Sequence, residues 1–310
     1  MTIGLVDVDG HRFPSLPLMK LSAWHKQNGD VVEWASPLFG EYDRLYMSKV
    51  FSFTPDDLAM YKAREVVRGG SGYAIRLAGG REVYDKSLDR QLPLEVEHIY
   101  PDYSLYPSLT ADTAYGFLSR GCPRRCSFCH VGAKEGCKAY KVADLGEFWR
   151  GQKNIVLCDP NILACRQWED LLGQLVDSRA WVDLNQGVDA RLLTPEKARA
   201  LNAVRIKEIH FAWDRYQERD QVLRGLRLYA EVCDRLPHGH SAIVYVLCNF
   251  DTTIEQDLDR IYTLRAMNYL PYVMIYDKAH AASIYRALER WVNNRFVFTA
   301  CERFDNYEYK

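Results

Sequence analysis

The sequence lacks a long apolar run, a leader segment and an excess of charge of either sign. No apolar stretch approaches the ~20 residues of a membrane-crossing helix, and the first residues contain neither a basic segment nor an apolar leader core. Forty basic residues stand against 41 acidic residues, which gives a formal charge of -1. A nucleic acid or an anionic membrane would therefore have to be bound by a local patch, because the whole protein provides no positive field.

Cysteine is also scarce. Nine cysteines in 310 residues fall below the density of a disulfide scaffold, and an odd number suits a reducing compartment in which thiols stay reduced or bind metal. Together with the missing leader, this predicts a soluble, cytoplasmic protein. The 48% of apolar residues suffices for one large core or for a large and a small core, and it excludes disorder as the main state.

The first part of the chain, residues 1–97, is predicted to be a small open α/β domain. Helical spacing of apolar residues predicts a helix over 18–29, and the capping residues Thr54 and Pro55, followed by Gly69 and Gly70, predict a second helix between them. Strands are expected at residues 3–6, 31–34 and 45–51. This order of elements is typical of a Rossmann-like unit.

A linker is predicted at residues 98–112. Two prolines and three tyrosines without a helical or alternating period occupy residues 98–109, which favours an extended segment on a surface.

Strand and helix candidates alternate through residues 113–310. The strand candidates are residues 114–119, 154–158, 181–184, 206–213, 241–248 and 271–276, and the polar helical stretches include residues 165–177, 219–235 and 254–267. Six such units predict a parallel sheet that curls into a partial (β/α)6 barrel with a C-terminal extension, short of the eight units that close a full barrel.

A dense cysteine motif follows the first expected barrel strand. Cys122, Cys126 and Cys129 have the spacing Cys-x-x-x-Cys-x-x-Cys, and three thiolates this close in sequence can ligate three of the four irons of a cubane cluster. The fourth iron then stays open to a small chelating ligand, which indicates catalytic chemistry rather than electron storage alone.

This motif resembles that of the radical S-adenosylmethionine (radical SAM) superfamily, with Phe128 as the aromatic residue before the last cysteine. The resemblance implies that Cys122, Cys126 and Cys129 hold a 4Fe-4S cluster whose open iron is chelated by S-adenosylmethionine (SAM). It implies reductive cleavage of SAM to methionine and a 5'-deoxyadenosyl radical, which abstracts hydrogen from an unknown substrate. Phe128 is then expected to pack near the adenine.

The whole chain is similar to radical SAM proteins that carry a cobalamin-binding-like domain in front. The segments that carry this likeness are residues 159–162, 185–187 and 290–295. The resemblance implies that the front domain either binds cobalamin or has lost that cofactor. A cobalamin-dependent radical SAM methyltransferase therefore stays open as an alternative, and the substrate is not identified.

A zinc site is a further alternative for the cysteines. Cys126 and Cys129 form a two-spaced pair, and Cys122, His130 or Cys137 could complete four ligands. The chain would then be a metal-stabilised binding module without enzymatic activity. The remaining cysteines lie in apolar segments and are expected to act as small hydrophobic residues: Cys158, Cys165, Cys233, Cys248 and Cys301.

Polar residues occur at the expected carboxyl ends of the barrel strands, where parallel barrels place their chemistry. Asp159, Asn185 and Asp214 are expected to face the cavity, since SAM offers a sulfonium, ribose hydroxyls and a carboxylate for polar groups to bind. Each of them could instead end its strand and cap the following helix.

Basic residues are concentrated around the cysteines. Residues 120–141 carry a local charge of +5 from Arg120, Arg124, Arg125, Lys134, Lys138 and Lys141 against Glu135. Such a patch could dock an acidic electron donor, such as a flavodoxin or ferredoxin, or an anionic substrate. Solvated surface lysines are the simpler alternative.

The segment after the first strand allows three interpretations. Asp7 and Asp9 match the opening of a phosphatase of the haloacid dehalogenase type, in which Asp7 would be a nucleophile beside magnesium. Asp9 and His11 also match the start of a cobalamin motif whose histidine ligates cobalt, although Pro14 stands where that motif has glycine. In the third interpretation the acids cap the helix that starts near Leu16.

Overall fold

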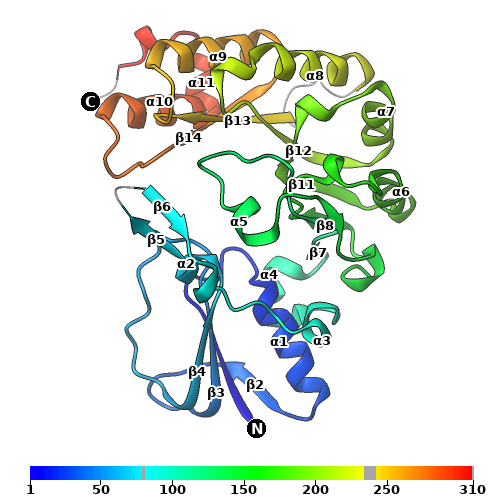
Figure 1. Ribbon diagram of the computed structural model, residues 1–310, viewed down its shortest axis with the longest axis vertical. Coiled ribbons are helices and arrows are strands. Elements are labelled where there is room, and N and C mark those ends of the chain that lie inside the picture. The colour runs from blue at the N-terminus through cyan, green and yellow to red at the C-terminus, as the bar shows by residue number, and fades with distance from the viewer. Residues whose placement is uncertain (79–80, 234–241, 309–310) are drawn as a thin grey trace. The chain divides into compact units, whose positions relative to one another are not determined.

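The computed structural model describes residues 1–78, 81–233 and 242–308 (Figure 1). The chain divides into two compact units, residues 1–156 and 157–310. The domain boundaries predicted from the sequence, after residues 97 and 112, remain predictions.

The first unit contains short strands and few long helices. Its strands are β1 (Thr2–Asp7), β2 (Val31–Trp34), β3 (Glu41–Ser48), β4 (Lys62–Gly69), β5 (Ile75–Ala78), β6 (Arg81–Tyr84), β7 (Thr113–Gly116), β8 (Ser119–Arg120) and β9 (Tyr140–Lys141), and β10 (Asn154–Leu157) ends at the division. Its helices are α1 (Leu16–Gln27), α2 (Ser71–Ala74), α3 (Leu94–Glu97), α4 (Pro107–Thr110) and α5 (Val131–Glu135).

The second unit contains longer alternating elements. Its strands are β11 (Trp181–Val188), β12 (Ile206–Ala212), β13 (Ala242–Cys248) and β14 (Leu270–Ile275), and its helices are α6 (Trp168–Ser178), α7 (Pro195–Ala203), α8 (Arg219–Val232), α9 (Ile254–Ala266), α10 (Ser283–Asn293) and α11 (Arg295–Ala300).

A four-stranded parallel sheet with the order β2-β1-β3-β4 lies in the N-terminal part of the first unit. We call it the front sheet, and we call residues 1–97 the front domain. Helix α1 begins with Pro17 in its first turn, which suits the fixed φ of proline, and Gly29 follows it with a φ of +80°. Its apolar side packs Leu18 and Leu21 against Ile3 and Leu5 of β1. The predicted helix over residues 18–29 and the strands at 3–6 and 31–34 are confirmed. The strand predicted at 45–51 is confirmed in part, because β3 ends at Ser48.

The second helix expected in this domain, between Thr54 and Gly70, is wrong. Residues 62–69 form β4, which pairs in parallel with β3 so that Leu45 lies opposite Val66 and Tyr46 opposite Val67. The local capping signal is overridden by strand pairing, because β-branched side chains pack well on a pleated surface.

The Tyr/Pro-rich segment is also not the extended surface segment that the sequence suggests. It contains α4 and a short 3-10 helix, and Tyr106 is 2% exposed. Tyr106 packs with Leu16, Met19 and Tyr115 in one buried cluster, and its hydroxyl donates to Asp7 Oδ2 at 2.7 Å. A tyrosine ring buries much apolar area once its single polar atom has a partner, and this segment therefore belongs to the core of the first unit.

All six barrel strands predicted from the sequence are present. The six-stranded sheet has the order β14-β13-β12-β11-β10-β7, and β11 to β14 pair in parallel. Ser241 of one predicted strand and residues 234–235 of one predicted helix lie outside the described residues. A sheet with β14 and β7 at its two edges is open, and this agrees with a partial barrel.

Helices cover one face of the strands of the second unit. Helices α9 and α10 pack on β13 and β14, and α6, α7 and α8 pack side by side (Figure 1). Side chains alternate between the two faces of a strand. Val182 and Leu184 are buried, whereas Asp183 and Asn185 point to the opposite, polar face of β11. That polar face is where the second unit can offer functional groups.

Three helices of this unit, α7, α10 and α11, were not among the helical stretches named from the sequence. For α7 the sequence did contain a signal, because Thr194 caps the Lys197 amide and Pro195 occupies the first turn. No described helix is long and apolar enough to cross a membrane.

Candidate functional site

The three motif cysteines lie on one loop of the first unit. Antiparallel pairing of β8 with β9 brings the two ends of the loop together. Inside the loop, the Cys122 amide donates to the Gly136 carbonyl at 3.2 Å and the Cys129 amide donates to the Cys126 carbonyl at 3.1 Å. These bonds and the β8–β9 pairing close the segment between Arg120 and Tyr140 into a compact loop.

Gly121 allows the loop to close. Its φ is +76°, and a Cβ atom at this position would lie 2.1 Å from the Lys138 carbonyl oxygen. Only glycine tolerates both this backbone conformation and this approach of the opposite end of the loop. The Gly121 amide donates to Glu135 Oε2 at 3.0 Å, which fixes the start of the loop against α5.

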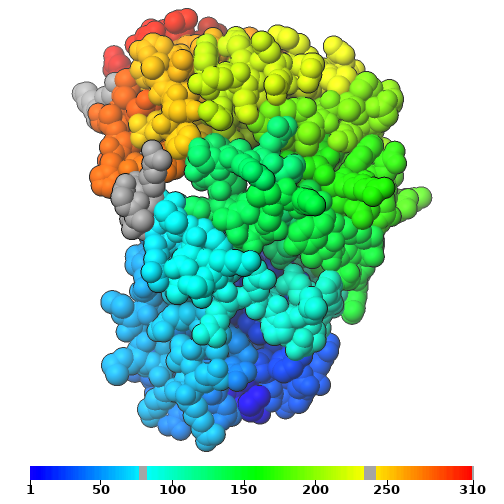
Figure 2. Space-filling model, viewed as in Figure 1, coloured from blue at the N-terminus to red at the C-terminus, as the bar shows by residue number. Residues whose placement is uncertain are grey.

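The motif cysteines are accessible, unlike most others. Cys122 and Cys126 are half-buried and Cys129 is exposed, and the loop lies at the surface in the green part of the colour scale (Figure 2). In contrast, Cys248 is buried, and burial raises the pKa of its thiol, which keeps it protonated. Three accessible thiols on one closed loop therefore fit the ligand set of a thiolate-bound cluster.

Two other donors of the loop bear on the zinc alternative. His130 Nε2 lies 3.3 Å from Glu82 Oε2, and Cys137 is exposed with its Sγ 3.9 Å from the Gly132 carbonyl. The His130 ring is thus already engaged by a carboxylate of β6, whereas Cys137 stays available on the loop.

The basic patch of the sequence separates into two groups. Arg120 is held inside the first unit, because its guanidinium pairs with Glu97 and with Glu135, each at 3.1 Å, and lies over the Phe117 ring. Arg125 and Lys138 are exposed, and Arg124 and Lys134 are half-buried. Arg120 therefore stabilises the loop rather than presenting a charge to a partner.

The strand-end residues Asp159, Asn185 and Asp214 follow or belong to three different strands. Asp159 comes after β10 and is 4% exposed. The sequence predicted that strand three ends before Asn185, which is wrong, since β11 extends to Val188. The strand continues because Val188 pairs with Phe211 of β12 after an irregularity that follows Leu184. The Asn185 carbonyl accepts a hydrogen bond from Tyr245 Oη at 3.3 Å.

Asp214 has an unusual electrostatic environment. Burial raises its pKa to about 6, against the opposing charges of Arg260 and Arg191 and with a contribution from Glu218. Arg191 donates from Nε to Asp189 Oδ1 at 2.7 Å and also pairs with Glu218. Perturbed carboxyl groups of this kind are concentrated at functional sites.

We expect Asp214→Asn to change how stability depends on pH. The folded-state pKa of Asp214 is above its ordinary value, so between pH 4 and about pH 6 the folded protein holds a proton that the unfolded chain has released. The stability of the wild-type protein therefore falls as the pH rises through this window. Asparagine does not titrate, so the variant does not lose stability in this way. The difference in melting temperature, variant minus wild type, should therefore increase from pH 4 to pH 7.5.

Thermal unfolding across this pH series measures the effect. Asp220→Asn, on the exposed side of α8, is the matched control and should follow the wild-type profile. Parallel pH profiles of wild type and Asp214→Asn would contradict the raised pKa.

Arg260 is a residue that the sequence analysis missed. It is fully buried, and its guanidinium donates to the carbonyls of Trp213, Asp214 and Leu247 and to the Asp257 carboxylate. These carbonyls lie at the carboxyl ends of β12 and β13. Arg260 therefore fixes the strand ends next to Asp214. The sequence did not reveal this role, because Asp257 and Arg260 are spaced like an ordinary ion pair on a helix surface.

The acids after β1 have structural partners. Asp9 accepts hydrogen bonds from the Val50 and Phe51 amides and from Thr54 Oγ1, so it holds the connection between β3 and β4. The expectation that these acids cap α1 is wrong, because Ser15 occupies the N-cap position and no acid lies in the first turn.

Asp7 and His11 are engaged by aromatic residues. The Tyr106 hydroxyl donates to Asp7, and burial raises the pKa of this carboxyl. The His11 ring lies 4.3 Å from the Trp34 ring and 5.6 Å from the Tyr106 ring, measured between centroids. These contacts favour a structural role for both residues.

A large cleft lies within the first unit. Its volume is about 1170 Å³, which is above the ~300–1,000 Å³ of most small-molecule pockets. Its walls are α1, the carboxyl halves of β3 and β4, the segment from Lys86 to His98, and the part of the cysteine loop from Gly132 to Val142. The front sheet and the cysteine loop thus border one cavity.

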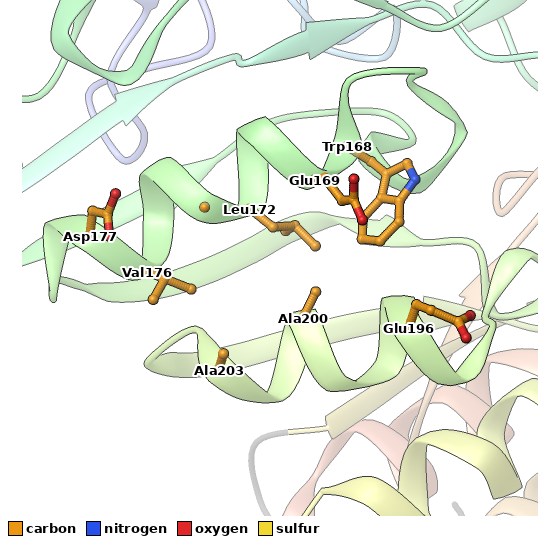
Figure 3. A pocket seen from close by; sticks show the side chains of 9 residues that line it. Trp168, Glu169, Leu172, Val176, Asp177, Glu196, Ala200 and Ala203 are labelled. Carbon is orange, nitrogen blue, oxygen red and sulfur yellow. The ribbon is translucent and has the colours of Figure 1, made fainter.

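A smaller groove, of about 240 Å³, lies between α6 and α7 in the second unit. Its lining residues are mostly from these two helices, among them Trp168, Leu172, Val176, Glu196 and Ala200 (Figure 3). It contains none of the strand-end residues, and its charged groups are the carboxylates of Glu169, Asp177 and Glu196 on the two helices.

No protein-family model matches the sequence, and no curated protein matches it. Among solved structures, the chain is similar to the radical S-adenosylmethionine methyltransferase TsrM from Kitasatospora setae, which has cobalamin and a [4Fe-4S] cluster bound. The TM-score is 0.60 at 12% sequence identity, and the likeness covers 88% of this chain and 74% of that chain.

The likeness covers more of the chain than the predicted barrel alone, so it extends into the front domain. It agrees with the open sheet of β7 and β10–β14 and with the parallel sheet of the front domain. The chain therefore shares the fold of this structure, with an open parallel sheet like that of a partial barrel preceded by a small parallel α/β domain.

Proposed function

We propose that the protein is a radical SAM enzyme that binds a 4Fe-4S cluster through Cys122, Cys126 and Cys129. The observation that carries the proposal is the closed loop with three accessible thiols in a chain that has the fold of a radical SAM methyltransferase. When bound, such a cluster supplies the electron that cleaves SAM reductively and so generates a 5'-deoxyadenosyl radical.

The residues of the chain contribute binding and orientation. Thiolates are the preferred ligands of iron in such clusters, and Cys122, Cys126 and Cys129 would supply all three from one loop. Phe128 is half-buried next to the last cysteine and would pack near the adenine. Asp159, Asn185 and Asp214 would bind polar groups of SAM, with Asp214 placed by the Arg260 contacts.

Anaerobic reconstitution tests the proposal. We expect about four iron and four sulfide per chain, and formation of 5'-deoxyadenosine and methionine when dithionite-reduced protein meets SAM. A colourless protein that holds zinc and no iron would support the zinc-stabilised module instead. A cluster without any SAM cleavage would contradict the enzymatic role.

The basic residues of the loop other than Arg120 are proposed to dock an acidic electron donor such as a flavodoxin or ferredoxin. We expect the double variant Arg124→Glu and Arg125→Glu to slow reduction by flavodoxin about tenfold or more at low salt, because electrostatic steering raises association rates by 10–10³. Reduction by dithionite should stay unchanged. An equal loss with both reductants would contradict docking. Lys153→Glu, a single charge reversal at an exposed position outside the loop, is the control.

A cobalamin-dependent methyltransferase is a second candidate. It is favoured by the cleft bordered by the front sheet and the cysteine loop, and TsrM, with the same fold, is a methyltransferase with cobalamin bound. His11 packs against Trp34 and Tyr106, so the proposal does not use it as a cobalt ligand.

Corrinoid binding after gel filtration tests this candidate. Val67 of β4 lines the cleft, whereas its neighbour Val66 is 42% exposed and points to the other face of the strand. If the cleft holds cobalamin, wild type and Val66→Trp retain one corrinoid per chain and Val67→Trp does not. Absence of corrinoid from the wild type would rule out this candidate and leave the radical SAM proposal intact.

A further inference from the structure

The polar face of the second unit contains a cluster of metal-ligating side chains that the proposed function does not use. Asp183 lies on β11 opposite Glu208 of β12, and His210 lies two residues after Glu208, so all three side chains point to the same face of the sheet. One potential ligand atom from each lies within 4.8 Å of the others.

The histidine is oriented as metal-binding histidines are. His210 is buried, and its Nδ1 lies 3.1 Å from the Leu184 carbonyl oxygen. If Nδ1 carries the proton, it donates a hydrogen bond to this carbonyl, and the lone pair of Nε2 is then available to bind a metal. Metal-bound histidines almost always donate their second ring nitrogen to a carbonyl or carboxylate in this way. The Tyr245 ring stacks on the imidazole at 5.1 Å between centroids and 11° between planes, which further fixes the ring.

The two carboxylates face the same space. Asp183 and Glu208 are direct neighbours across β11 and β12, a placement in which like charges repel. Glu208 Oε1 lies 3.1 Å from His210 Nε2, and Asp183 Oδ1 lies 3.7 Å from Nδ1. Donor atoms bound to one tetrahedral ion at about 2.0–2.2 Å lie about 3.4 Å apart. The distance between Glu208 Oε1 and His210 Nε2 is close to this value, whereas the Asp183 distance is measured to Nδ1, the ring nitrogen that faces the Leu184 carbonyl.

An oxygen atom of the cluster is left without a hydrogen bond. Asp183 Oδ1 is buried and has no hydrogen-bond partner in the part of the chain that the structure describes. The positive groups nearby are Lys207, which is exposed, and Arg295, whose guanidinium is 3.9 Å from Glu208 Oε2 and 51% exposed. Neither approaches Asp183 closely enough to satisfy this atom.

From these contacts we propose that Asp183, Glu208 and His210 bind a divalent transition-metal cation. Two carboxylate oxygens and one imidazole nitrogen suit Mn²⁺, Fe²⁺ or Zn²⁺. Three protein ligands leave at least one coordination position for water or for an oxygen of a bound molecule. The cation would lie on the same face of β11 as Asn185, that is, on the face that the proposed SAM site uses.

Mn²⁺ is the probe that separates this site from the cysteine loop, because carboxylates suit Mn²⁺ whereas thiolates select softer metals. The purified full chain is treated with a chelator, desalted and titrated with Mn²⁺, and free Mn²⁺ is measured by its room-temperature EPR signal. We expect one Mn²⁺ per chain in the wild type, displaced by Zn²⁺. Asp183→Asn and His210→Gln should each weaken binding at least tenfold.

Asp220→Asn on α8 is the matched control and should bind Mn²⁺ as the wild type does. Because a ligand variant could also lose its fold, the wild type is melted with and without Mn²⁺, and its melting temperature should rise with the ion. Absence of Mn²⁺ binding to the wild type, or unchanged binding in both ligand variants, would overturn the proposal. Either result leaves the iron content and SAM cleavage of the cysteine loop unaffected, so it bears on this site alone.

Discussion

Replacing Cys126 by alanine is expected to abolish cluster binding and SAM cleavage. The residue is the middle ligand of the three, and its carbonyl also accepts the amide of Cys129. An iron with no protein thiolate is readily lost, and without the cofactor the chain has no group that can deliver an electron to SAM. We expect 5'-deoxyadenosine formation to fall at least about a thousandfold, with iron content reduced in parallel. Cys122→Ala and Cys129→Ala should behave alike.

Cys137→Ala is the control that gives this experiment its meaning. Cys137 lies on the same loop and is exposed, so its replacement tests a neighbouring thiol of similar accessibility. If three cysteines hold the cluster, this variant keeps its iron and its activity. If Cys137 is a fourth ligand, as in a zinc site, the variant loses metal to the same degree as Cys126→Ala. The second result would contradict the open iron on which SAM binding depends.

The cysteine loop could be predicted from the sequence because its information is local. The ligand spacing is set by eight consecutive residues, and no contact with a distant segment is needed to recognise it. Gly121 was not singled out, since the need for glycine arises from the approach of the Lys138 carbonyl. That approach depends on the pairing of β8 with β9, which neither short strand reveals.

Two predictions from the sequence, the helix between Thr54 and Gly70 and the surface position of Tyr106, were wrong because contacts between distant segments decide both. The segment that became β4 carries helix-capping residues at its start, and only pairing with β3 shows that Val66 and Val67 belong to a sheet. Tyr106 was placed on a surface because its neighbours are prolines, whereas its partners are Asp7 and the α1 residues Leu16 and Met19. In each case a contact between distant segments outweighed the local pattern.

The polar face of the barrel sheet was only partly predicted. Asp159, Asn185 and Asp214 were named because polar residues after apolar runs mark the ends of strands, although Asn185 lies inside β11. Glu208 and His210 lie within β12 instead, and only alternation of side chains along the strand places them on the polar face. A search for polar residues two apart within an expected strand would have found this pair.

Arg260→Met is expected to cost about 3–5 kcal/mol of unfolding free energy, the range found when one partner of a buried ion pair is removed. Both Arg260 and Asp257 are fully buried. The substitution leaves the Asp257 charge without its partner and removes the donors of the Trp213, Asp214 and Leu247 carbonyls. Urea denaturation measures the loss, and Arg227→Met, at an exposed position of α8, should stay within about 0.5 kcal/mol of wild type.

The double variant Asp257→Leu and Arg260→Met separates the buried charge from the lost hydrogen bonds. Replacing a buried ion pair by apolar residues of similar volume is often neutral, so removal of the Asp257 charge should recover part of the loss. We expect only part of the unfolding free energy to be recovered, because the Trp213, Asp214 and Leu247 carbonyls still lack the Arg260 donors. Each unsatisfied group costs about 1–3 kcal/mol. Full recovery would mean that these carbonyls need no donor. A single variant as stable as wild type would contradict the role of Arg260 in holding the strand ends together.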